Sequence, residues 1–151
     1  IDKYAQLGNA QAFQFSKPRI EGLNFSFSGL KTSILYTIRD QVKLDEQFKE
    51  THLNDLCASI QNSIVSILME KIEKAVKETG INCVVIAGGV SANSELRKRL
   101  SAKMEHGWKV SIPKFSYCTD NAAMIAMAGK FLFEQGVRAD QSISAQARLD
   151  W

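Results

Sequence analysis

The chain has 151 residues, which is enough for one domain with a buried core. Hydrophobic residues make up 45% of it and charged residues 23%, which is the composition of a folded globular protein rather than a disordered one. The formal net charge of +3 favours no particular partner. No apolar run approaches the roughly 20 residues needed to cross a bilayer, and the first residues lack the apolar core of a signal peptide. We therefore expect a cytoplasmic protein with no membrane contact. Because the chain opens without Met, we also expect a fragment of a longer protein.

Two short patterns of period two predict strands near the start of the chain. Phe13 and Phe15 alternate with polar residues, and so do Phe25 and Phe27. Strict alternation is typical of a strand with one buried face, and Gly29 is expected to end the second strand.

Two longer patterns predict helices. Apolar residues at every fourth position predict a helix over 30–42, and an apolar seam spaced by three or four residues predicts another over 53–78. Gly80 lies just past the second helix, where a left-handed C-cap is expected.

The chain from 83 to 100 organises the rest of the sequence. An uninterrupted apolar run predicts a strand over 82–87, buried on both faces as in a parallel sheet. Gly88 and Gly89 follow, and Ser91 is expected to cap a helix over 92–105. This arrangement of a strand, a glycine turn and a helix N-terminus favours a binding site for phosphate or ribose. The same residues are equally explained as a turn that only connects the strand to the helix.

Asn93 has two interpretations that the sequence leaves open. Its amide can bond a base or a ribose, or it can act as a second capping residue. The basic residues of the same helix also have two interpretations, a solvated helix face or a nucleic-acid contact. These basic residues are Arg97, Lys98, Arg99 and Lys103.

Asp120 is the carboxylate that follows the second expected strand, over 108–112. The order of strands and helices predicts a parallel sheet with right-handed crossovers, which would bring Asp120 and Asn93 to one sheet edge. A carboxylate beside a phosphate-binding turn can hold a divalent metal. Alternatively, Thr119 or Asp120 only caps a last helix, whose face of small residues would let it lie close against a sheet or another helix.

Three segments together resemble the TsaD-type tRNA threonylcarbamoyladenosine synthases, a family formerly described as O-sialoglycoprotein endopeptidases or glycoproteases. They are NFSFSGLKTS at 24–33, VVIAGGVSANSELRKRL at 84–100 and CTDNAAMIAMAG at 118–129. The resemblance implies an α/β lobe of the actin/hexokinase/heat-shock ATPase type, which is ribonuclease H-like and has a parallel or mixed sheet flanked by helices. It also implies that residues 1–151 are the carboxyl-terminal lobe of a two-lobed enzyme.

The resemblance also assigns the site residues. Asp120 matches the family's metal-ligand aspartate, and Gly88, Gly89, Asn93 and Asp2 match residues that contact the nucleotide. The resemblance also implies one bound divalent metal ion, for which iron is the first candidate and zinc and magnesium are the alternatives. The two histidines of the family's HxxxH motif are absent from this sequence. No catalytic residue is assigned.

The implied activity of the full-length protein is transfer of a threonylcarbamoyl group from its adenylate to adenosine in tRNA. The implied partners are threonylcarbamoyl-adenylate or an ATP-like nucleotide, tRNA, and partner proteins of a modification complex. We expect the fragment alone to be inactive. The alternatives are a non-catalytic nucleotide-binding or interaction module of the same fold and the older metallo-endopeptidase assignment, for which no HExxH motif or nucleophile–histidine pair is found.

Overall fold

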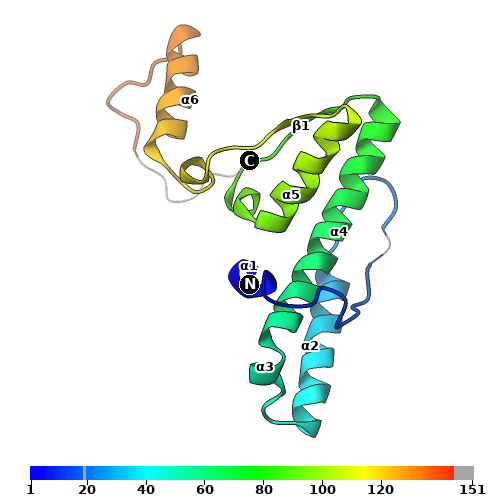
Figure 1. The fold of residues 1–151 in the computed structure, drawn as a ribbon. Coiled ribbons are helices and arrows are strands. Elements are labelled where there is room, and N and C mark those ends of the chain that lie inside the picture. The colour runs from blue at the N-terminus through cyan, green and yellow to red at the C-terminus, as the bar shows by residue number, and fades with distance from the viewer. Residues whose placement is uncertain (19, 145–151) are drawn as a thin grey trace.

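The structure is a computed structural model that describes residues 1–18 and 20–144. Its centre is helix α4 (Leu53–Thr79), along which the other elements are arranged (Figure 1). The helix predicted over 53–78 is confirmed. So is its C-cap, because Gly80 has a φ of 70° and its N–H donates to the carbonyl oxygen of Val76 at 2.9 Å.

Helix α2 (Ser28–Leu44) packs beside the first half of α4, where Leu30 and Ile67 form a buried cluster with Phe15. The helix predicted over 30–42 is therefore confirmed and begins two residues earlier. Of two short helices, α1 (Asp2–Ala5) precedes this pair and α3 (Phe48–Thr51) lies between α2 and α4 in the chain. The chain after α1 runs very close to α4, since a Cβ at Gly8 would collide with the backbone carbonyl of Asn54.

The two strands predicted around Phe13–Phe15 and Phe25–Phe27 are wrong, because both segments are irregular. Within residues 1–18 and 20–144, neither segment has a neighbouring strand with which to pair. The N–H of Phe13 donates instead to the Ser59 hydroxyl at 3.1 Å, and Phe25 and Phe27 stack with ring centroids 6.3 Å apart. A ladder of backbone hydrogen bonds is what turns an alternating pattern into a strand, and here a side chain of α4 binds the backbone of the first segment instead. Side chains of α4 also bind the backbone of the loop between the two segments. Lys71, for example, donates to the carbonyl of Gly22 at 2.7 Å.

The second half of the chain contains a small parallel sheet. Strand β1 (Cys83–Val85) pairs with β2 (Lys109–Ser111) in a register that places Val84 opposite Val110. The connection consists of a 3₁₀ helix η1 (Gly89–Ala92), helix α5 (Ser94–Lys103) and a 3₁₀ helix η2 (Met104–His106). The expectation of parallel pairing is confirmed, although the described part of the chain is mostly helical.

One face of this sheet is covered and the other is open. Leu96 and Leu100 of α5 form a core with Val65 and Met69 of α4, and Val84 lies over it with other apolar residues of the two strands. On the opposite face, Val85 is 68% exposed and Cys83 is also exposed. The prediction that this strand is buried on both faces is therefore wrong for the described residues, because no element packs on its outer face.

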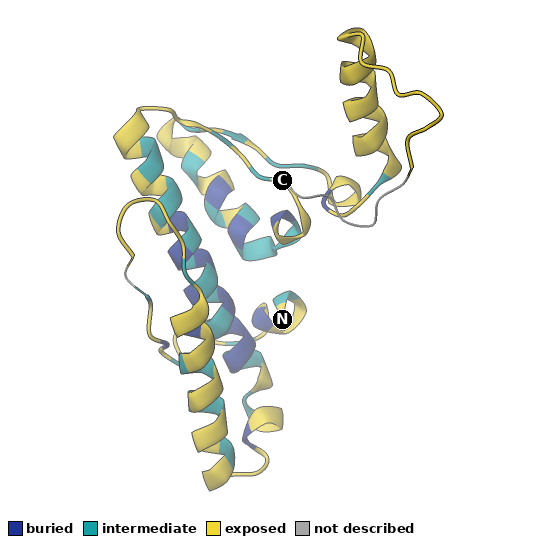
Figure 2. Ribbon diagram, turned by 180° about the vertical axis from the view of Figure 1, so that it is seen from behind, coloured by how far each residue is buried: buried dark blue, intermediate teal, exposed yellow. Residues whose placement is uncertain are grey.

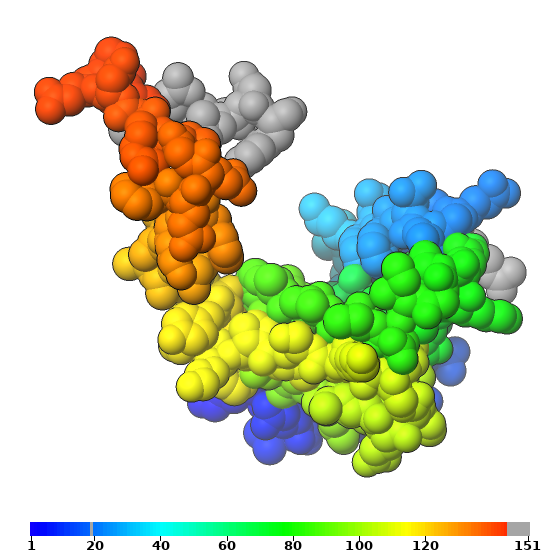
Figure 3. Space-filling model, turned by 90° about the horizontal axis from the view of Figure 1, so that it is seen from above, coloured from blue at the N-terminus to red at the C-terminus, as the bar shows by residue number. Residues whose placement is uncertain are grey.

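Helix α6 (Ala122–Glu134) follows a 3₁₀ helix η3 (Phe115–Tyr117) and projects away from the other elements (Figure 3). None of its residues is buried, whereas the buried residues of the protein gather along α4 and α5 (Figure 2). The expectation that its face of small residues lies close against another element is thus wrong for the described residues. None of the described helices is both long and apolar enough to span a bilayer.

Candidate functional site

A cavity of about 490 Å³ lies where the two parallel strands end. Gly88 and Gly89, which follow β1, line one side, and the segment from Tyr117 to Asp120, which follows β2, lines the other. Because parallel strands end on the same edge of a sheet, residues 30 positions apart in the sequence meet here. The structure therefore brings together three of the five residues singled out from the sequence: Gly88, Gly89 and Asp120.

The glycine turn has a backbone that only glycine adopts readily. Gly88 has φ 79° and ψ 178°, a combination that is strained for any residue with a Cβ. Gly89 has no positive φ and begins η1, so only Gly88 has a backbone conformation that requires glycine. A Cβ built at either glycine would meet no atom of a non-neighbouring described residue within 4 Å, so a ligand can approach this backbone closely.

Asp120 is exposed at the mouth of the cavity. Among residues 1–18 and 20–144, no group donates a hydrogen bond to its carboxylate, so both oxygens can accept a ligand. The helix-capping role expected for Thr119 or Asp120 belongs to Asn121 instead, whose Oδ1 accepts from the N–H of Met124 at 3.0 Å. Asp120 is thus not needed as a cap.

A single carboxylate is a weak metal site. The described residues contain no group of three or more His, Cys, Asp or Glu side chains able to hold a metal ion. A carboxylate oxygen suits a divalent cation, but four to six ligands are normally needed. Asp120 therefore fits a metal ligand only if further ligands come from outside the described residues.

The start of α5 is already capped by the chain itself. The Asp2 carboxylate accepts hydrogen bonds from the backbone N–H and the hydroxyl of Ser94, at 3.1 and 2.5 Å. Asn93 is the N-cap, with its Oδ1 accepting from the N–H of Leu96 at 3.0 Å. The expected Ser91 cap is wrong, since Ser91 lies inside η1 and its hydroxyl donates to the carbonyl of Gly88 at 2.6 Å.

This capping changes where a phosphate could bind. A helix N-terminus attracts anions, but here the Asp2 carboxylate occupies that position on α5. Asn93 also donates from Nδ2 to Oε1 of the buried Gln61 at 2.8 Å, so its amide is engaged on both sides. Asp2 and Asn93 therefore lie together at the start of α5, and neither lines the cavity between the glycine turn and Asp120.

Arg97 is a residue whose position the sequence analysis missed. Its guanidinium donates to the carbonyl oxygens of Ser91 and Pro113, at 2.9 and 2.7 Å, and so joins the segments that follow β1 and β2. The only sequence signal was its place next to Leu96, which belongs to the buried face of α5.

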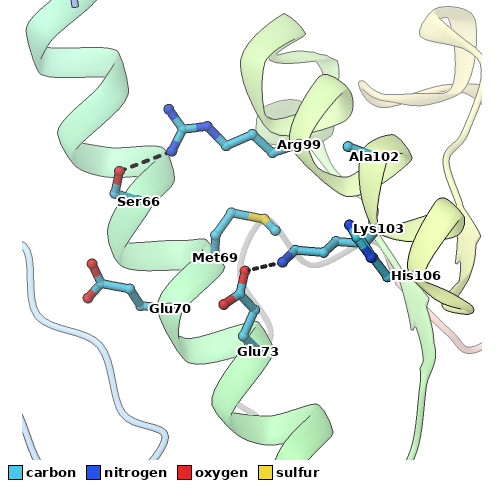
Figure 4. Close-up of a pocket in the computed structure, with 8 residues that line it drawn as sticks. All are labelled: Ser66, Met69, Glu70, Glu73, Arg99, Ala102, Lys103 and His106. Atoms are coloured by element: carbon cyan, nitrogen blue, oxygen red, sulfur yellow. Dashed lines mark hydrogen bonds and ion pairs between the residues drawn. The ribbon is translucent and has the colours of Figure 1, made fainter.

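The other basic residues of α5 are also engaged. Arg99 donates to the Ser66 hydroxyl at 3.0 Å, and Lys103 pairs with Glu73 at 2.7 Å (Figure 4). Both line a second cavity, of about 390 Å³, between α4 and α5. Of the four basic residues, only Lys98 is exposed, so the prediction of a solvated basic face is wrong for the other three.

Parallel strands with a glycine turn and a carboxylate at their carboxyl ends define an α/β protein whose candidate site lies at the sheet edge. The sequence model described as "tRNA N6-adenosine threonylcarbamoyltransferase" (TsaD) matches residues 1–127, so the chain belongs to this family.

Curated relatives carry the same description. The chain is similar to the tRNA N6-adenosine threonylcarbamoyltransferase of Christiangramia forsetii, with 55% identity over 149 residues that cover 98% of this chain and 44% of the relative. The proteins of Riemerella anatipestifer and Thermosipho africanus are 50% and 45% identical, each over 99% of this chain and 44% of its own length. The chain thus spans somewhat less than half the length of these relatives.

Proposed function

We propose that this chain is part of a tRNA N6-adenosine threonylcarbamoyltransferase and that its cavity between the glycine turn and Asp120 takes part in binding the nucleotide of the acyl donor. Membership of the family supports the proposed activity. The proposed binding site rests on one observation, that Gly88, Gly89 and Asp120 line the same cavity. In the full-length protein, residues 1–151 would be the carboxyl-terminal lobe of an actin/hexokinase/heat-shock ATPase-like fold.

The chemistry is an acyl transfer from threonylcarbamoyl-adenylate. The N6 amine of adenosine attacks the carbamoyl carbon, a C–N bond forms, and the C–O bond to the adenylate phosphate breaks. AMP leaves with the bonding electrons, and the amine loses a proton. The backbone of Gly88 and Gly89 would lie against the adenylate, whose approach a side chain at Gly88 would obstruct.

Asp120 would serve as one ligand of a divalent metal ion. Iron is the first candidate for this ion, and zinc and magnesium are the alternatives. Such an ion, when bound, would neutralise the phosphate charge and polarise the acyl-phosphate group. The remaining ligands would come from the part of the protein outside this chain, because the described residues offer no complete set. Asn93 and Asp2 would border the nucleotide from the start of α5.

The tRNA and the partner proteins of a modification complex are further elements of this proposal. Arg97, Arg99 and Lys103 already bind groups of the chain itself, so they are poor candidates for phosphate contacts. Lys98 is the exposed basic residue of α5 and a better candidate.

The test is transfer of threonylcarbamoyl to tRNA by the full-length protein, with wild type compared with Asp120→Ala. Glu50→Ala is the matched control, since Glu50 is an exposed carboxylate on α3, outside the cavity. We expect Asp120→Ala to lose bound metal and transfer activity with an unchanged circular dichroism spectrum, and Glu50→Ala to retain both. Unchanged transfer by Asp120→Ala would refute the metal role, and persisting nucleotide binding without any transfer by wild type would favour the non-catalytic binding module.

A further inference from the structure

The segment that carries Asp120 is attached to the rest of the molecule by few contacts. It runs from Ile112, after β2, to Asn121, before α6, and its backbone bonds within 114–118 are local turns. Among the described residues, Arg97 supplies every side-chain hydrogen bond that joins this segment to the elements before it, and the only other such bond leads forward, from Met124 of α6 to the Asn121 cap. Because α6 buries no residue, it does not anchor the segment from the other side.

Arg97 contacts the Asp120 segment at three points. Its Nη2 donates to the Pro113 carbonyl at 2.7 Å, and its Cζ lies 4.2 Å from the ring centroid of Phe115. Its Nη1 lies 3.7 Å from the sulfur of Cys118, which is 2% exposed and in turn donates to the carbonyl of Lys114 at 3.4 Å. The guanidinium thus holds the 3₁₀ helix η3, which ends at Tyr117, shortly before Asp120.

The same guanidinium holds the glycine turn. Nη1 donates to the carbonyl of Ser91 at 2.9 Å, and both the N–H and the hydroxyl of Ser91 donate to the carbonyl of Gly88, at 3.0 and 2.6 Å. Ser91 is 1% exposed, so the residue that links Arg97 to Gly88 is itself buried. A planar guanidinium has its donors in a fixed fork, so bonds in two directions fix the separation of the two segments.

We propose that Arg97 is a positioning residue that sets the separation of the glycine turn and Asp120, and thereby the geometry in which the cavity holds its ligand. This inference rests on the proposed function for its effect on transfer. Displacement of a binding group by about 1 Å can reduce a rate by roughly 10²-fold, so such a clamp influences catalysis without touching the substrate.

The experiment compares Arg97→Gln and Arg97→Lys with Arg99→Gln in the full-length protein. Arg99 is the matched control, because it is also half-buried on α5 and bonded to α4 but does not contact the Asp120 segment. The readouts are the rate of Cys118 alkylation by iodoacetamide, followed by mass spectrometry, and kcat/KM for transfer from threonylcarbamoyl-adenylate. Melting temperatures separate a loss of the clamp from general unfolding.

We expect Arg97→Gln to accelerate Cys118 alkylation by at least about 10-fold and to lower kcat/KM by on the order of 10²-fold. Arg97→Lys, which keeps the charge and one hydrogen bond, should fall between it and wild type. Arg99→Gln should leave Cys118 protected and lower kcat/KM much less, at a comparable melting temperature. If Arg97→Gln fails to fold, the alkylation rate of Cys118 and kcat/KM of Arg97→Lys test the inference in its place.

Protection of Cys118 in both Arg97 variants, or equal losses in Arg97→Gln and Arg99→Gln, would overturn the inference. The failure of the proposed function has a different signature. In that case Cys118 becomes reactive in Arg97→Gln as expected, while Asp120→Ala transfers as well as wild type.

Discussion

The Asp2 carboxylate caps helix α5 by accepting hydrogen bonds from the backbone N–H and the hydroxyl of Ser94, which is 92 residues further along the chain. Asp2 belongs to α1, which packs on α4, so this bond ties the first residues of the chain to the helix that follows the glycine turn. An anion is favourable at this end of a helix because the free N–H groups and the helix dipole both point toward it.

We predict that Asp2→Ala lowers the free energy of unfolding by about 1 kcal/mol, the usual cost of losing a helix cap. Ser94→Ala should cost less, since the backbone N–H of Ser94 remains bonded to Asp2. The double variant should be less destabilised than the sum of the two, because both remove the same interaction. Urea unfolding of the four proteins measures this coupling, and strict additivity would contradict it. A loss of nucleotide affinity in Asp2→Ala beyond that in Ser94→Ala would support the proposed ligand contact.

Gly88 and Gly89 form an internal control for the strain at the glycine turn. We predict that Gly88→Ala is less stable than Gly89→Ala by about 1–3 kcal/mol, because only Gly88 has a backbone conformation that an L side chain rarely adopts. A Cβ meets open space at both positions, so a difference cannot come from a clash. Thermal unfolding of the two variants provides the comparison. Equal stabilities would show that the turn relaxes without cost.

The exposed apolar side chains of α6 predict self-association of the 151-residue chain in isolation. They include Met124, Ile125, Phe131 and Phe133, each at least 50% exposed. Apolar surface of this kind on one element marks an interface in many proteins. We expect the light-scattering mass to rise with concentration, and the double variant Ile125→Glu, Phe133→Glu to remain monomeric. A monomer at high concentration for the unmodified chain would contradict this.

The Arg39 side chain donates a hydrogen bond to the Asp40 carboxylate and holds the pKa of that carboxyl below its usual value, with a smaller Coulombic contribution from the same guanidinium. A lowered folded-state pKa means that the pair stabilises the fold above the unfolded pKa. This stabilisation is lost as the pH falls through the folded pKa. We predict that Arg39→Gln raises the pKa of Asp40 toward its ordinary value, as measured by carboxyl NMR titration. Because both groups are exposed, the melting temperature at pH 7 should change little, and an unshifted pKa would contradict the prediction.

The spacing of apolar residues correctly predicted helices that bury one face, such as α4. The seam of α4 and the positive φ of Gly80 are properties of consecutive residues, and both are confirmed. The pattern at Phe25 and Phe27 is equally regular but led to the wrong element. A strand needs a partner for its backbone, and that partner is not encoded in the segment itself.

In the candidate site, too, some features could be predicted from the sequence and others could not. The order of strand, helix and strand predicted that Asp120 and Asn93 meet at one sheet edge beside the glycine turn, since parallel strands end on the same side. Asp120 does line one cavity with Gly88 and Gly89, whereas Asn93 does not line it. The capping interpretation of Asn93 agrees with the structure, whereas Asn121 was not predicted as a cap, because Thr119 and Asp120 beside it are equally able to act as one. Asn93 and Asn121 act as caps only because the backbone turns directly before them.

The long helix and the glycine turn could be predicted from the sequence alone, because they depend on hydrophobic spacing and backbone conformation over consecutive residues. The parallel pairing of the two strands could be predicted from the order of strand, helix and strand along the chain. By contrast, the contacts by which Asp2 caps α5 and Arg97 binds the segment before Asp120 become apparent only in the folded protein. Hydrogen bonds have a range of about 3 Å, so their partners are defined only once folding has brought distant residues together.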